Sequence, residues 1–265
     1  MKIKILLFIS LTFSFNSFIW ANEIPISGYF GCSRSTNLVD YKDGSRFDGL
    51  DSFYGLRYGL NSDYALGLSS AFSKNLNSLE SELSFSDVQL NLSKNAVALG
   101  DFLTWNQSLS WTVPTSKDSL QNRSLQSALG MNVNFNLNPK YLFKNLNLSA
   151  FVSLNRNFHK YETSLTGQMN NAYSLGKGVN LSYDIMPKLN FTSSFSLRNN
   201  WSYYNNRQDY FGINEEINFQ IIPHWSMALG HSNNGETLKP DGVNSNIQIM
   251  DPNSSMVYTS STLNF

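Results

Sequence analysis

The sequence is poor in cysteine, in charge and in long apolar runs. Cys32 is the only cysteine among 265 residues, so no intrachain disulfide braces the fold, and we interpret it as a small side chain packed on a strand. Charged residues make up 14% of the chain and the formal net charge is zero. This balance provides no basic face for nucleic acid and no acidic tail for a cationic partner. We therefore expect no nucleic-acid partner.

Only the start of the chain is continuously apolar. Lys2 and Lys4 precede an apolar stretch, 5–15, and Ala21 is a small residue at which a peptidase can cut. This pattern predicts an export signal over residues 1–21, removed near Ala21, and one mature domain over 22–265. No later stretch approaches the roughly 18 to 20 apolar residues of a membrane-spanning helix. Any crossing of a membrane must therefore use strands.

Most of the mature chain alternates between apolar and polar residues. In QSALGMNVNFNLNPK, which starts at Gln126, every second residue from Leu129 to Leu137 is apolar, and glycine or asparagine stands between. A period of two predicts a strand with one apolar and one polar face. The pattern recurs in LNLSAFVSLN, SLGKGVNLSYDI and KLNFTSSFSLRNNWSY. Such runs of about ten to thirteen residues exceed the usual strands of a soluble sandwich.

Short and long connections alternate between the predicted strands. Tight turns are expected at LNSDY, LNPKY, IMPKL and IIPHW, which carry proline, asparagine or aspartate. Longer polar segments separate the other strand pairs, and the longest is 233–254. We therefore predict an all-β fold, a transmembrane up-and-down antiparallel β-barrel of about twelve strands with short periplasmic turns. The predicted strands are 26–38, 51–61, 64–75, 86–95, 102–113, 126–138, 146–160, 172–185, 189–203, 208–222, 224–233 and 254–265.

Aromatic residues near the strand ends favour a bilayer over water. Trp105 and Trp111 share the apolar face of one predicted strand and stand roughly 15 Å apart in height. Trp201, Tyr203 and Trp225 also lie near strand ends in the apolar phase. Such rings prefer the membrane interface, where one edge is wet. We predict that these five residues form an interface girdle in contact with outer-membrane lipid.

The end of the chain carries a family resemblance. The last predicted strand reads SSMVYTSSTLNF, and Val257, Thr259 and Leu263 share the phase of the terminal Phe265. This ending resembles bacterial outer-membrane β-barrel proteins, whose final strand commonly closes on an aromatic residue. The resemblance implies the outer membrane of a Gram-negative bacterium as location. It also implies the barrel-insertion machinery as a partner, with Phe265 as the insertion signal.

The polar phase is expected to line the lumen of the barrel. Most of its members are small and neutral, such as Ser69, Asn132 and Ser194, and these leave space for water. Five charged residues share this phase, and they either pair as fixed plugs or form a constriction for a passing solute. These candidate lumen charges are Arg57, Asp87, Asp184, Arg198 and Glu216.

One stretch, GHSNNG at 230–235, is similar to a pattern of lipid-degrading outer-membrane barrels. Outer-membrane phospholipase A and lipid A deacylase carry histidine, serine and asparagine on a strand near the outer rim. Here Ser232 directly follows His231, so the two side chains point to opposite faces of the strand. Asn233 then occupies the position of the nucleophile. We therefore predict no catalytic residues and keep hydrolysis through His231 as a lesser alternative.

The sequence contains no motif for a cofactor or a metal. His159, His224 and His231 fall on different predicted strands without carboxylates at ligand spacing. The leading hypothesis is a passive, porin-like channel for small polar solutes. A structural or surface-interaction barrel with a closed lumen is the second hypothesis, and the lipid hydrolase is the third. A soluble periplasmic β-protein would replace all three, but the long alternating runs and Phe265 disfavour it.

Overall fold

The computed structural model describes residues 25–39, 46–77, 83–252 and 254–265. The predicted signal peptide lies outside these residues, and its cleavage near Ala21 stays a prediction. The strands are β1 (Ile26–Asn37), β2 (Asp48–Gly59), β3 (Tyr64–Asn75), β4 (Leu83–Phe85), β5 (Val88–Leu99), β6 (Leu103–Val113), β7 (Leu125–Leu137), β8 (Leu146–His159), β9 (Asn171–Met186), β10 (Leu189–Ser202), β11 (Arg207–Ile222), β12 (Trp225–Glu236) and β13 (Ser255–Asn264).

Among the described residues, helical structure is limited to two short turns, η1 (Asp118–Asn122) and η2 (Pro139–Tyr141). In the described part of the chain, no helix combines the length and the apolar character that a membrane span requires.

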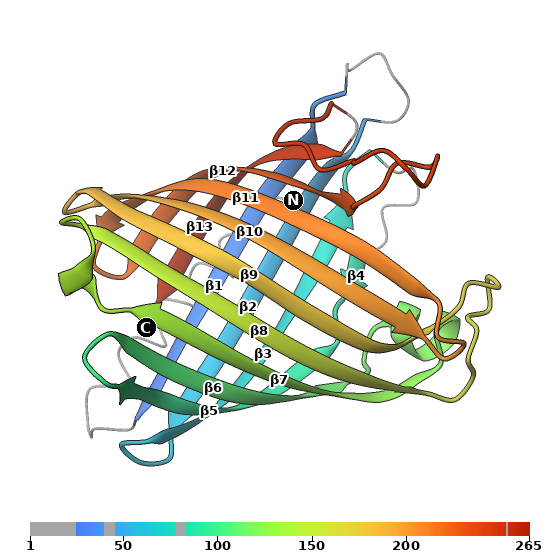
Figure 1. Cartoon of the computed structure of the whole chain (residues 1–265), viewed down its shortest axis with the longest axis horizontal. Helices are drawn as coiled ribbons and strands as arrows, with labels where there is room; N and C mark the ends of the chain where they lie inside the picture. The colour runs from blue at the N-terminus through green and yellow to red at the C-terminus, as the bar shows by residue number, and fades with distance from the viewer. Residues whose placement is uncertain (1–24, 40–45, 78–82, 253) are drawn as a thin grey trace, which may run out of the picture.

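The strands form one antiparallel sheet that closes on itself (Figure 1). β1 pairs with both β2 and β13, and the pairing of β2 with β3 completes the ring. β4 and β5 both pair with β3. Because these two strands share one place, the thirteen strands of the sheet fill twelve positions. The predicted twelve-strand antiparallel barrel is therefore confirmed.

Three strands extend three or four residues beyond a predicted end: β2, β12 and β5, which ends at Leu99 where the alternation predicted 95. β12 continues to Glu236, which pairs with Tyr210, so this strand ends three residues after its predicted end at 233. Polar residues can extend the pairing of β11 with β12, because backbone groups alone form its hydrogen bonds. β2 begins at Asp48, where Arg34 of β1 forms an ion pair of 2.6 Å with its carboxylate. The period of two does not detect strand ends held by such contacts.

Side chains alternate between an outward and an inward face of the wall. On β6 and β12 the outward residues Leu109 and Leu229 expose 55% and 54% of their surface. The same phase carries most of the exposed leucines, tyrosines and tryptophans of the other strands. The inward phase carries mostly serine, asparagine and glycine. Large apolar side chains in water are unfavourable, so this surface is suited to lipid.

The two ends of the barrel differ. At the end where β1 begins and β13 finishes, called the turn end below, the connections are short, as at 187–188 and 223–224. The opposite end, the loop end, carries the longer connections 114–124, 160–170 and 237–254. Twelve strands about 4.8 Å apart and tilted by about 40° give a backbone diameter of roughly 25 Å. The lumen is therefore wide enough for its side chains to decide whether it is open.

Candidate functional site

The inward wall on β6, β7, β9 and β10 consists of short polar side chains. Asn106 on β6 pairs with Asn134 on β7, and Ser149 on β8 pairs with Asn180 on β9. Some of these groups bond laterally along the wall, since Asn180 Nδ2 donates to Ser149 Oγ at 3.2 Å. Amide and hydroxyl groups bond both water and polar solutes without adding charge. Apart from Asp184 on β9 and Arg198 on β10, this part of the lumen is neutral and hydrophilic.

Four of the large inward side chains lie flat against the wall. Four inward aromatic residues each stand directly opposite a glycine on the next strand. A Cβ built on any of these glycines would lie within 2.7 Å of the facing ring, so each ring rests on the space that glycine leaves. The pairs are Tyr29–Gly55, Phe53–Gly31, Phe151–Gly178 and Tyr258–Gly230. This arrangement keeps bulky rings out of the centre of the lumen.

Tyr258 has the most extensive contacts of these rings. It crosses over Gly230 of β12 and brings its hydroxyl within 2.9 Å of both Asn214 Oδ1 and Glu216 Oε2 on β11. The single hydroxyl proton is therefore shared between two acceptors. Glu216, one of the predicted lumen charges, is thus held against the wall.

The other predicted inward charges have separate partners. Arg57 Nη2 donates to Asn95 Oδ1 at 3.0 Å, and Asp184 Oδ1 accepts from Asn190 Nδ2 at 2.7 Å. Arg198 lies on the inward face of β10 with an exposed side chain. Among the described residues, no ion pair joins any two of the five predicted charges. They are spread around the wall and do not form a single plug.

A further inward charge, Asp51, was missed by the sequence analysis. It lies on β2 in phase with Phe53 and Arg57, opposite Ser33 of β1. The predicted strand began at this residue, so its side chain was not assigned to a face. Its phase relative to Arg57 is the signal that could have placed it in the lumen.

Asp87 occupies a structural position at the loop end. It lies between β4 and β5, and its carboxylate accepts hydrogen bonds from the backbone N–H groups of Thr115 and Ser116 and from Ser119 Oγ. Burial opposes ionisation, but these donors outweigh it and hold the pKa of Asp87 below the ordinary value. Asp87 therefore anchors the loop that carries η1.

Asp87→Asn is expected to loosen this loop without unfolding the barrel. Loss of the charge-assisted bonds should favour local opening by about 1–3 kcal/mol, seen as faster tryptic cleavage after Lys117. Because the folded pKa is lowered, the carboxylate stabilises the loop fully above about pH 4 and loses this effect as pH falls through the lowered value. Amide exchange of residues 115–119 measures the pH dependence. Asp101→Asn, at the turn end, is the control, and equal cleavage in both variants would contradict the anchor.

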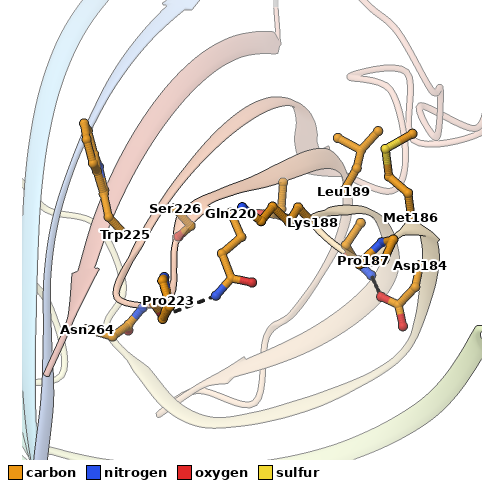
Figure 2. A pocket seen from close by; sticks show the side chains of 12 residues that line it. Asp184, Met186, Pro187, Lys188, Leu189, Gln220, Pro223, Trp225, Ser226 and Asn264 are labelled. Atoms are coloured by element: carbon orange, nitrogen blue, oxygen red, sulfur yellow. Dashed lines mark hydrogen bonds between the residues drawn. The ribbon is translucent and has the colours of Figure 1, made fainter.

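Two cavities open at the turn end of the lumen. The larger, about 460 Å³, is lined on its inward side by Arg57, Ser69 and Asn91 among others. The second, about 330 Å³, lies between the turns after β9 and β11. Figure 2 shows Asp184 and Gln220 on separate sides of this second cavity. Gln220 Nε2 donates to the carbonyl of Pro223 at 3.2 Å, and Asp184 Oδ1 accepts from Asn190 Nδ2 at 2.7 Å. Both polar side chains are therefore fixed in place.

The predicted girdle residues lie at both ends of the wall. Trp105 and Trp225 are on the outward face near the turn end, where Trp225 Nε1 donates to Ser261 Oγ at 2.8 Å. Trp111 and Trp201 are outward residues near the loop end. Tyr203 follows β10, and its hydroxyl donates to the carbonyl of Asn157 at 2.8 Å. Their role as a membrane girdle stays a prediction.

His231 faces outward, away from Ser232. The register of β12 is unbroken at this point, because Ser232 pairs with Asn214 and Met256 in the inward phase. Glu215, which the sequence pattern did not single out, stands opposite His231 with 3.5 Å between Oε2 and Nδ1. The other ring nitrogen, Nε2, is enclosed by the chain and has no hydrogen-bond partner there. The next residue of β12 on this face is Asn233, so asparagine and not serine stands where the nucleophile would be.

No candidate metal centre arises from the residues that the structure describes, because no three histidine, cysteine, aspartate or glutamate side chains gather closely enough to hold an ion.

Comparison with known proteins identifies the fold and no sequence family. No protein-family model and no curated protein matches the sequence. The NanC porin matches with a TM-score of 0.57 and 14% identity, over 90% of this chain and 98% of its own. An outer membrane channel from Pseudomonas putida F1 matches with a TM-score of 0.61 and 12% identity, over 92% of this chain and 97% of its own. The chain therefore has the fold of bacterial outer-membrane β-barrel proteins.

Proposed function

We propose that the chain is a passive channel of the Gram-negative outer membrane for small polar solutes. The observation that carries this proposal is the packing of four inward aromatic rings over glycines. Short polar side chains form most of the remaining lumen wall. The exposed apolar outward face supports a location in lipid. Similar folds in a porin and an outer membrane channel agree with this function.

The test is single-channel recording of the folded chain in a planar bilayer. A gel of unheated and heated samples establishes folding, because a folded barrel migrates differently before boiling. Discrete conductance steps from such a sample are expected. Absence of steps from a demonstrably folded sample would refute the channel.

Arg57 is expected to influence ion selectivity. It lies in the larger turn-end cavity, and its charge is not neutralised by a carboxylate among the described residues. Arg57→Glu should raise the permeability of cations relative to anions by about two- to fivefold, measured as a reversal potential in a salt gradient. Lys94→Gln, on the outward face of β5, is the control and should leave the reversal potential unchanged. Equal potentials for all three proteins would place Arg57 outside the conducting path.

A closed barrel that binds surface partners is the second candidate. The loops 114–124 and 160–170 bond to each other, since Leu165 N donates to the carbonyl of Asn122 and Asn170 Nδ2 to that of Arg123. The nearby inward residues Ala128, Ala172, Asn200 and Ser202 are buried. These contacts narrow the loop end on one side.

The loop 237–254 supports the binding role of this second candidate. It exposes apolar side chains, including 81% of Val243 and 65% of Ile249. A closed barrel would conduct only after deletion of 162–169, and it would lose partner binding after deletion of 238–250.

A further inference from the structure

The outward face near the loop end carries a row of cationic and aromatic residues. Arg156 of β8 pairs with Tyr173 of β9, Tyr173 with Trp201 of β10, and Trp201 with Arg207 of β11. Lys177 lies on the same face of β9, four residues further from the loop end than Tyr173. We call these five residues the outward basic patch. Cations are unexpected on a surface that otherwise faces lipid, so their placement calls for a ligand.

Arg156 is held in place by aromatic rings. Its guanidinium carbon lies 4.1 Å from the centre of the Tyr173 ring and 5.3 Å from that of Tyr203. One N–H group donates to the carbonyl of Ala172 at 3.3 Å. Within the described residues no carboxylate forms an ion pair with Arg156. Stacking uses the faces of a guanidinium and leaves edge N–H groups to bind an anion.

The remaining charges of the patch leave it cationic. Arg207 lies 5.9 Å from the Trp201 ring centre, and it forms a 2.6 Å ion pair with Asp209. Asn199 Nδ2 also donates to this carboxylate at 2.7 Å. Asp209 is therefore occupied by Arg207, whereas Lys177 forms no ion pair among the described residues. The charge of Lys177 also acts on Asp209, so the three cations Arg156, Lys177 and Arg207 share one carboxylate and the patch keeps a net positive charge.

We propose that the outward basic patch binds the phosphorylated sugar headgroup of an outer-leaflet glycolipid. Phosphate suits the free edge of Arg156 and the ammonium of Lys177. The exposed Tyr173 ring presents a flat surface on which a sugar ring can stack. The acyclic glycerol of a phospholipid stacks on such a ring less well. The outward leucines Leu129, opposite Arg156, and Leu154, two residues nearer the turn end, are exposed by 52% and 55% and fit acyl chains. This inference rests on the proposed membrane location, but it does not require an open lumen.

The test measures binding of fluorescent lipopolysaccharide to the folded full chain in detergent. The double variant Arg156→Gln/Lys177→Gln should bind about tenfold more weakly. Lys94→Gln is the matched control, because Lys94 is also outward and lies 5.9 Å from the Tyr64 ring centre, but near the turn end. It should bind as the unmodified chain does. Equal affinities for the double variant and the control would overturn the proposal.

Two further measurements separate the alternatives. Phosphatidylglycerol vesicles should displace the lipopolysaccharide poorly, and displacement at equal phosphate concentration would overturn the assignment to a glycolipid. Single-channel conductance of the double variant should equal that of the unmodified chain, since both side chains point outward. A silent but folded barrel that still binds lipopolysaccharide would refute the channel and leave the lipid site intact. Arg156→Lys checks folding, because it keeps the charge and loses only the planar edge.

Discussion

Gly230→Ala is expected to reduce the single-channel conductance to about half, because a ring that now lies flat must turn into the lumen. A Cβ on Gly230 would lie 2.2 Å from Tyr258 Cζ, a separation that no packing tolerates. Main-chain pairing fixes Gly230 between Glu216 and Tyr258, so the ring has to move. After side chains are added, the lumen of a barrel about 25 Å wide is roughly 10–15 Å across. One upright tyrosine occupies a large part of it.

The same substitution should lower stability. Tyr258 would lose its bonds to Asn214 and Glu216, and overpacking adds strain, for a combined cost of about 1–3 kcal/mol. Urea unfolding, followed by the difference in gel mobility, measures this cost. The magnitude is small enough for the barrel to remain folded during conductance measurements.

Two further variants identify the ring as the cause. Gly230→Ala/Tyr258→Ala should restore or exceed the original conductance, because the displaced ring is gone. Gly67→Ala is the control for an added inward methyl group, since its Cβ would lie 3.6 Å from the nearest atom. If the double variant conducts as poorly as Gly230→Ala alone, the ring does not block the lumen. Conductance that is unchanged in Gly230→Ala would show that the conducting path lies elsewhere.

The strands were predictable because a wall one residue thick has only two environments. Lipid on one side and the lumen on the other require an alternation that the sequence displays directly, as in Leu129 to Leu137. Both ends of β3 were predicted correctly, and the ends of most other strands were predicted within about two residues. The interruption between β4 and β5 was not visible, because it depends on Asp87 binding a loop that follows β6. Contacts between separate loops leave no period in the sequence.

The composition of the lumen was predictable, but its shape was not. The inward phase identified Arg57 and Glu216 from alternation alone. Tyr258 lies over Gly230 because of the register between β12 and β13. The sequence alone does not specify this register. The opposition of Glu215 and His231 depends on register in the same way. Pairing across strands is therefore the information that had to come from the structure.

Phe265→Ala is expected to lower the amount of assembled barrel in cells more than about fivefold, while the purified chain still folds in detergent. Phe265 extends the closure of the barrel, since its N–H donates to the Gly28 carbonyl at 2.9 Å and its carbonyl accepts from the Gly28 N–H at 2.8 Å. These bonds are made by the backbone and survive the substitution. The ring packs over Gly28 but remains 46% exposed, so its loss should cost only about 1–2 kcal/mol. The remaining effect in cells would come from the proposed reading of the terminal aromatic residue by the insertion machinery.

Gly28→Ala separates these two contributions. Its Cβ would lie 2.6 Å from Phe265 Cζ, so it displaces the ring from the closing seam and leaves the terminal aromatic residue in the chain. If the terminal ring is a signal, Gly28→Ala should weaken the detergent-folded barrel at least as much as Phe265→Ala, yet assemble far better in cells. Heat-modifiable protein in the membrane fraction measures assembly, and unfolding in urea measures the seam. If both variants lose assembly in cells in proportion to their loss of stability in urea, Phe265 acts only by packing at the closure. The cell would then respond to stability alone.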